Sequence, residues 1–131
     1  MPIEHEIDHQ RRLVLARGHG TLTDAEVFHY QSSVWSHPEV AGYDELFEMS
    51  DVADITPPST ERIRELAQLS AAMDALSPSR LAIVAPDDLP FALGRMYETH
   101  RGLDKRSTKT VSVFRSVGDA LAWLGSERSA T

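Results

Sequence analysis

The residues of this chain whose types could support catalysis or metal binding are its six histidines and several aspartates near predicted strand ends. The histidines lack metal-ligand spacing: His5 and His9 are four residues apart, but in a strand pattern rather than on a helix. A histidine beside an aspartate could act as a general base, yet no serine lies in a G-x-S-x-G setting. The absence of cysteine excludes thiolate catalysis, disulfides and zinc–thiolate sites. We therefore expect a protein that is not an enzyme, with no catalytic residues, no metal and no cofactor.

Acidic residues follow two of the predicted strands. Asp51 comes after the strand pattern at 45–50, and Asp87 and Asp88 come after the pattern at 81–85. Because ligands of parallel α/β sheets bind at the carboxyl ends of the strands, these carboxylates could form a site for a divalent cation. Nothing resembles a D-x-D-x-D-G loop, so we favour the alternative, in which Asp87 or Asp88 caps a helix and Asp51 lies in a turn.

The helix pattern at 87–101 supplies the remaining candidate ligand-binding residues. Pro86 ends the wholly apolar strand before it, and Pro90 falls in the first turn, where a missing N–H does little harm. The spacing predicts an apolar side that faces the core, formed by Leu89, Ala92, Leu93, Met96, Tyr97 and His100. The opposite side is predicted to carry Gly94, Arg95, Glu98 and Arg101.

Two interpretations of this helix remain open. Phe91, Met96 and Tyr97 could form one wall of an apolar pocket, with the Tyr97 hydroxyl at the polar end of a bound lipid or small acid. Arg95 could also face the ligand. We favour the alternative, in which the apolar residues belong to the core and Arg95 makes a surface ion pair. Gly94 costs roughly 1 kcal/mol relative to alanine in a helix, which suggests that another element or a dimer partner approaches closely.

The elements that must position these residues follow a regular order. Alternating strand and helix patterns predict a single α/β domain with the order β-β-α-β-α-β-α-β-α. Right-handed crossovers then give a mostly parallel five-stranded sheet, with the first strand antiparallel at an edge and the helices mainly on one face. The predicted strands lie at 3–8, 12–17, 45–50, 81–85 and 110–115, and the predicted helices begin at Thr23, at Ser59 or Thr60, at Asp87 or Asp88, and at Ser116.

Two helix starts have the form of a capping box, in which the first residue caps the helix and an acidic residue three positions later bonds back. These are Thr23 with Glu26, and Ser116 with Asp119. We expect Gly18-His19-Gly20 to end the second strand and 51–58 to form a loop. The closing helix is predicted to bury a stripe of Val117, Ala120, Leu121 and Leu124.

Composition limits the classes of function. The net charge of −7 argues against binding to nucleic acid or to an anionic membrane surface. No apolar run approaches the roughly 20 residues of a membrane span, and the first residues lack the apolar core of a signal peptide. We expect a cytoplasmic protein with one domain at 1–125 and a flexible tail at 126–131.

Four stretches together resemble the SpoIIAA-like family of small bacterial α/β proteins, which is related to STAS domains and more distantly to CRAL-TRIO lipid binders. They are GHGTLTDAEV at 18–27, HPEVAGYDELFEMSDV at 37–52, LAIVAPDDLPFALGRMYE at 81–98 and VSVFRSVGDALAWL at 111–124. The resemblance implies a strand–helix superhelical sheet, frequent dimerisation and no established catalytic activity.

STAS regulators carry a phosphorylatable serine at a helix start, in a D-S-x-G-like pattern. The matching region here, 54–60, lacks the glycine and contains two prolines. Ser59 and Thr60 remain at a helix start, where a phosphate would interact favourably with the helix dipole, but we favour a plain helix cap for them.

These observations predict a non-catalytic STAS-like binding or regulatory module that acts through protein–protein contacts, as a homodimer with a regulatory protein partner. The alternative is a carrier or sensor of a lipid or small apolar ligand, held in a CRAL-TRIO-like pocket. For either function, the candidate ligand-binding residues are Asp51, Asp87, Asp88, Phe91, Arg95, Met96 and Tyr97.

Overall fold

The computed structural model describes residues 3–34, 38–40, 42–55, 60–72, 79–104 and 109–125. The strands are β1 (Ile3–Asp8), β2 (Leu13–Leu22), β3 (Asp44–Ile55), β4 (Ser79–Val84) and β5 (Lys109–Phe114). The helices are α1 (Asp24–Val34), α2 (Thr60–Ala72), α3 (Asp88–Leu103) and α4 (Val117–Gly125), with a short 3-10 helix at Pro38–Val40. This order confirms the predicted β-β-α-β-α-β-α-β-α arrangement in a single α/β domain.

The five strands form one sheet in the order β1-β2-β3-β4-β5. The β1–β2 pair is antiparallel, as expected for a hairpin, and the other three pairs are parallel. The sheet is therefore mixed, with the antiparallel strand at the edge where the sequence places it. Each parallel pair is joined through a helix, which is the connection that parallel neighbours require.

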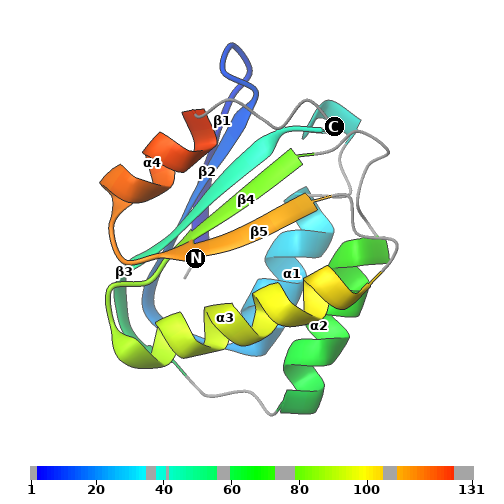
Figure 1. Ribbon diagram of the computed structural model, residues 1–131, viewed down its shortest axis with the longest axis vertical. Coiled ribbons are helices and arrows are strands. Elements are labelled where there is room, and N and C mark those ends of the chain that lie inside the picture. The colour runs from blue at the N-terminus through cyan, green and yellow to red at the C-terminus, as the bar shows by residue number, and fades with distance from the viewer. Residues whose placement is uncertain are drawn as a thin grey trace.

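The helices lie on both faces of the sheet, three on one and one on the other (Figure 1). Strand alternation assigns side chains to the two faces: Leu81 and Ile83 of β4 pack beneath α1, α2 and α3, whereas Ala82 and Val84 pack beneath α4. The larger core lies on the three-helix side, which confirms that the helices lie mainly on one face.

Strands β2 and β3 are both longer than predicted. Gly18-His19-Gly20 does not end β2, because the strand bends there through two register shifts against β3 and continues to Leu22. Gly20 has a φ of +62°, a conformation that glycine adopts without strain. The backbone of 19–22 pairs with that of 51–55, so Asp51 lies in a strand and not in the predicted turn.

Helix α3 is rotated relative to the prediction. Its buried residues are Pro90, Gly94, Tyr97 and Arg101, whereas Leu89 and Ala92 are exposed. Gly94 explains the rotation: a Cβ at this position would lie 3.2 Å from Cγ1 and 3.3 Å from Cγ2 of Val113, so its backbone sits directly on β5. The close approach expected for Gly94 is therefore made by the sheet.

The helix starts agree only in part with the predicted caps. Thr23 Oγ1 donates to Glu26 Oε1 at 2.9 Å and accepts from the Glu26 N–H at 3.4 Å, which confirms the first box. The Asp119 N–H donates to Ser116 Oγ at 3.2 Å, which confirms Ser116 as a cap. Asp87 occupies the N-cap position of α3, but its side chain makes no capping hydrogen bond. Leu121 of α4 is 38% exposed, so its predicted place in the buried stripe is wrong, and Trp123 packs there instead.

Candidate functional site

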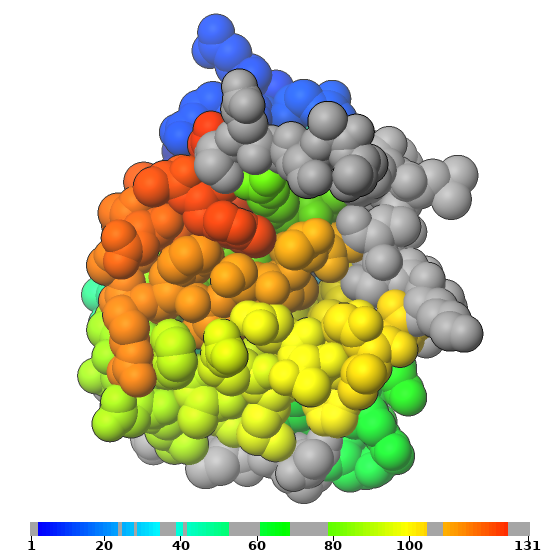
Figure 2. Space-filling model, in the orientation of Figure 1, coloured from blue at the N-terminus to red at the C-terminus, as the bar shows by residue number. Residues whose placement is uncertain are grey.

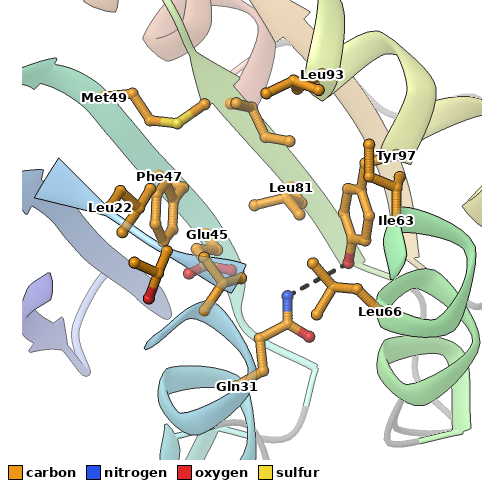
Figure 3. Close-up of a pocket in the computed structure, with 14 residues that line it drawn as sticks. Leu22, Gln31, Glu45, Phe47, Met49, Ile63, Leu66, Leu81, Leu93 and Tyr97 are labelled. Atoms are coloured by element: carbon orange, nitrogen blue, oxygen red, sulfur yellow. Dashed lines mark hydrogen bonds between the residues drawn. The ribbon is translucent and has the colours of Figure 1, made fainter. Parts of the chain in front are cut away.

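A pocket of about 110 Å³ lies between the sheet and helices α1, α2 and α3 (Figure 3). Its polar lining residues are Thr23, Gln31, Glu45 and Tyr97. Its apolar lining residues are Leu22, Val27, Phe47, Met49, Ile63, Leu66, Leu81, Ile83, Leu93 and Gly94. We call this space the sheet–helix pocket.

Strand alternation and helix spacing together build the apolar wall. In β3, Phe47 and Met49 point to the same face because they are two residues apart. Ile63 and Leu66 are three residues apart on α2 and therefore lie on one side of that helix, facing the strands. The pocket thus forms where two layers of regular structure meet.

Polar side chains that are buried in the fold gather at one end of the pocket. Glu45 is 2% exposed and accepts a hydrogen bond from the hydroxyl of Tyr30. Arg101, also 2% exposed, donates from NH1 to the Tyr97 hydroxyl oxygen at 2.8 Å. Gln31 Nε2 donates to the same oxygen at 3.4 Å, which is the bond drawn as a dashed line in Figure 3.

These contacts determine which hydrogen bonds the Tyr97 hydroxyl can still make. A phenol has two acceptor lone pairs and one O–H donor. Gln31 and Arg101 occupy the acceptor side, and the hydroxyl hydrogen finds no acceptor within the part of the chain that the structure describes. Tyr97 can therefore donate a hydrogen bond into the pocket.

Of the predicted ligand-binding residues on α3, only Tyr97 lines the pocket. Phe91 and Met96 are partly buried and pack against the edge of the core. The guanidinium of Arg115 lies 4.0 Å from the centre of the Phe91 ring. Arg95 is exposed and lies 3.8 Å from Glu98, the surface ion pair that the sequence favours.

The predicted acidic residues do not share one site. Asp51 Oδ2 lies 3.7 Å from His19 Nδ1 and 4.0 Å from Arg17 Nε, beside β2. Asp88 Oδ1 instead accepts a hydrogen bond of 2.9 Å from Arg115 NH1, and Asp87 is exposed next to it.

Two further observations concern metals and phosphorylation. Among the described residues, no group of three or more histidine, aspartate and glutamate side chains could hold a metal ion. Thr60 is the first residue of α2, and Ser59 lies outside the described residues, so the doubtful phosphorylation site stays a prediction.

Sequence reasoning missed Glu45 and Gln31, although strand alternation contains a signal for the first. Glu45 lies two residues before Phe47 and four before Met49, so the three side chains point to the same face of the strand. The pattern ELFEMS therefore already places a carboxylate on the apolar face. A charged residue at such a position is buried and needs a partner. Nothing in the local pattern around Gln31 distinguishes it from a surface residue.

An apolar wall with a few convergent polar groups is the usual composition of a small-molecule site. The sheet–helix pocket offers this arrangement, together with one hydroxyl donor. Within the described ranges, no helix combines the length and the apolar composition needed to cross a membrane.

Comparison with known proteins gives a similarity of fold. No protein-family model matches the chain, and no curated protein matches it. The crystal structure of an uncharacterized protein of the DUF3478 family from Shewanella loihica PV-4, described as having a SpoIIAA-like fold, is similar over 93% of both chains. The TM-score is 0.57 and the sequence identity is 17%. The chain thus adopts a SpoIIAA-like fold, as its sequence resemblance predicts.

Proposed function

We propose that this protein is a non-catalytic binding module that holds a small, mainly apolar molecule in the sheet–helix pocket. The pocket itself is the observation that carries the proposal: about 110 Å³, apolar on most sides and polar at one end. An engineered apolar cavity of about 150 Å³ binds benzene, so this volume suits a short alkyl chain or a small ring.

The polar end of the pocket favours a ligand with a hydrogen-bond acceptor. The Tyr97 hydroxyl has its acceptor side occupied by Gln31 and Arg101, and among the described residues its hydrogen has no acceptor. The donated bond from the buried guanidinium of Arg101 increases the strength of Tyr97 as a donor, because successive hydrogen bonds polarise one another. A carbonyl or carboxyl oxygen on the ligand would meet this hydrogen.

The SpoIIAA-like fold also suggests a STAS-like module. A regulatory protein partner, a homodimer and a cytoplasmic location remain predictions from the sequence. The pocket favours the small-ligand alternative because its shape and lining directly specify the size and polarity of an occupant.

The proposal can be tested by NMR titration of the isotope-labelled protein with hexanoic acid. Hexanoic acid should cause saturable shifts of the backbone amides of Leu81, Ile83 and Tyr97. Leu66→Trp should fill the pocket and abolish these shifts, whereas Leu121→Trp on the opposite face should leave them unchanged. Tyr97→Phe should weaken hexanoic acid binding by about tenfold, the effect of one lost hydrogen bond.

Two results would contradict the proposal. One is a set of shifts scattered over the surface without saturation. The other is unaltered hexanoic acid binding by Leu66→Trp in a variant that remains folded by circular dichroism.

A further inference from the structure

The two ends of the sheet–helix pocket differ in polarity. Figure 3 places Met49 and Leu93 at one end, and Gln31, Glu45 and the Tyr97 hydroxyl at the other. Glu45 and Met49 are four residues apart in β3, which corresponds to about 13 Å along the strand. An elongated ligand would therefore place its polar head beside Glu45 and Tyr97 and its apolar tail towards Met49.

Charges of opposite sign flank the polar end. The carboxyl group of Glu45 lines the pocket and accepts a hydrogen bond from the Tyr30 hydroxyl. The Arg101 guanidinium does not line the pocket and lies behind Tyr97, with NH1 2.8 Å from the phenol oxygen. Helix α3, which carries Tyr97 and Arg101, covers this side of the molecule as a continuous band, yellow-green to yellow in Figure 2. Because both charged side chains are buried, they act on a ligand through a lower dielectric than surface charges do.

A negatively charged head group fits this end poorly. A ligand carboxylate could accept the Tyr97 hydrogen, but it would lie beside the carboxylate of Glu45. Glu45 lines the pocket directly, whereas Tyr97 separates Arg101 from it, so repulsion by Glu45 outweighs attraction by Arg101. Removal of the ligand carboxylate from water adds a further cost.

A positively charged head group leaves the Tyr97 hydroxyl without a partner. An ammonium group has three donors and no acceptor, so it could bond to Glu45 but not accept from Tyr97. A buried donor that stays unpaired costs free energy, and the ammonium must also lose its hydration. The polar end therefore favours a neutral head group.

The neutral head group must both accept and donate a hydrogen bond. The hydrogen of the Tyr97 hydroxyl has no acceptor among the described residues, so it requires an acceptor on the ligand. A carboxylate such as Glu45 has about four acceptor sites and no donor, so it favours a donor on the ligand. A primary amide carries both functions, a carbonyl oxygen and an NH₂ group, on one carbon atom.

We propose that the sheet–helix pocket selects a short aliphatic primary amide, with its carbonyl oxygen on the Tyr97 hydroxyl and its N–H on the Glu45 carboxylate. This assignment rests on the function proposed above, because it requires an occupied pocket, and it adds the chemical class and the orientation of the occupant. Glu45 is then the residue that discriminates an amide from the corresponding acid.

The experiment compares four probes that share one alkyl chain, by NMR titration of the wild-type protein at neutral pH. Hexanamide should bind most tightly. 2-Heptanone has a methyl group in place of the NH₂ group, so it keeps the carbonyl and the shape but loses the donors, and it should bind about tenfold more weakly. Hexanoic acid, which is ionised at this pH, and hexylamine should each bind at least about tenfold more weakly than hexanamide.

A matched pair of variants tests the role of Glu45. Glu45→Gln removes the charge at nearly constant volume, so it should reduce the preference for hexanamide over hexanoic acid to less than about threefold. Glu48→Gln is the control, because Glu48 lies on the other face of β3 beside Arg17, and it should leave the preference unchanged. If Glu45→Gln does not fold by circular dichroism, the four probes on the wild-type protein decide the question.

Intermolecular nuclear Overhauser effects in the wild-type protein test the orientation. The terminal methyl group of hexanamide should be close to the Met49 methyl group, and the CH₂ next to the carbonyl should be close to the Tyr97 ring. The reverse pattern would overturn the proposed orientation.

The outcomes separate this assignment from the function on which it rests. If none of the four probes binds saturably, the proposed function fails and the amide assignment fails with it. If hexanoic acid or hexylamine binds as tightly as hexanamide, the pocket is a binding site but does not select a neutral head group. Equal binding of 2-heptanone and hexanamide would exclude the hydrogen bond to Glu45. Each of these last two results overturns the amide assignment alone.

Discussion

Removal of one hydroxyl group, by Tyr97→Phe, should destabilise the protein by about 2 kcal/mol. The hydroxyl accepts a 2.8 Å hydrogen bond from the Arg101 guanidinium, and bonds to charged groups contribute about 1.5–3 kcal/mol. The second bond, from Gln31 at 3.4 Å, is long and adds about 0.5 kcal/mol. Other interactions of Arg101 recover part of the loss, which gives the net value.

The assay is urea unfolding followed by circular dichroism. A loss of about 2 kcal/mol lowers the midpoint by about 1 M urea without a change in the slope, and it lowers the melting temperature by about 6–10 °C. Tyr43→Phe is the matched control, because the hydroxyl of Tyr43 is bonded to Nδ1 of His9 at 2.8 Å. His9 is largely exposed, so water can replace this partner, and the control should lose less than about 1 kcal/mol.

A double-mutant cycle with Arg101→Met tests the stated cause. If the buried guanidinium depends on Tyr97, the two substitutions together should cost less than the sum of their separate effects, by about 1 kcal/mol or more. The reasoning is refuted if Tyr97→Phe stays within about 0.5 kcal/mol of the wild type, or if Tyr43→Phe costs more than Tyr97→Phe.

Three further substitutions test local features of the fold by the same urea assay. Gly94→Ala should change stability by less than about 1 kcal/mol, because the gain in helix propensity offsets the 3.2 Å contact between the new Cβ and Val113. Gly94→Leu should cost about 3 kcal/mol, because its larger side chain does not fit against β5. Equal effects of the two substitutions would show that α3 is not held against β5 at this point. Thr23→Ala should cost about 1 kcal/mol and Thr23→Ser much less, since only the second keeps the capping oxygen; an equal loss would contradict the capping role. Arg115→Ala should cost about 0.5–1 kcal/mol, because it removes exposed contacts with Asp88 and Phe91. The cost should be smaller in high salt, and a loss of stability that does not depend on salt would contradict the assignment of this cost to charge interactions.

The order of the elements could be predicted because each one has a local signal. The apolar run at 81–85 and the capping pair Thr23–Glu26 identify a buried strand and a helix start from neighbouring residues alone. The lengths of β2 and β3 could not be predicted in this way. Gly18-His19-Gly20 has the local composition of a strand end, and only pairing with 51–55 keeps this segment extended.

The orientation of α3 shows the same limit. A helix with apolar residues on two sides has no single inward face in its sequence, and the contact between Gly94 and Val113 decides which side is buried. The absence of a side chain at Gly94 allows the backbone to lie on the sheet, and this turns Arg101 inward and Leu89 outward. Only part of the pocket could therefore be predicted from the sequence. Helix spacing predicts Tyr97, whereas Glu45 can be identified only from its alternation with Phe47 and Met49 along β3.

Stability alone does not account for Glu45 and Arg101 in the interior of this domain. Burial of a charged side chain costs several kcal/mol, and replacement of buried ionic groups by apolar residues of similar volume is often neutral or stabilising. Both residues are 2% exposed, and each is bonded to a tyrosine, Glu45 to Tyr30 and Arg101 to Tyr97. Glu45 and Tyr97 line the polar end of an otherwise apolar pocket. The proposed function would give these buried polar side chains a role that core packing does not, which is recognition of a polar group on the ligand.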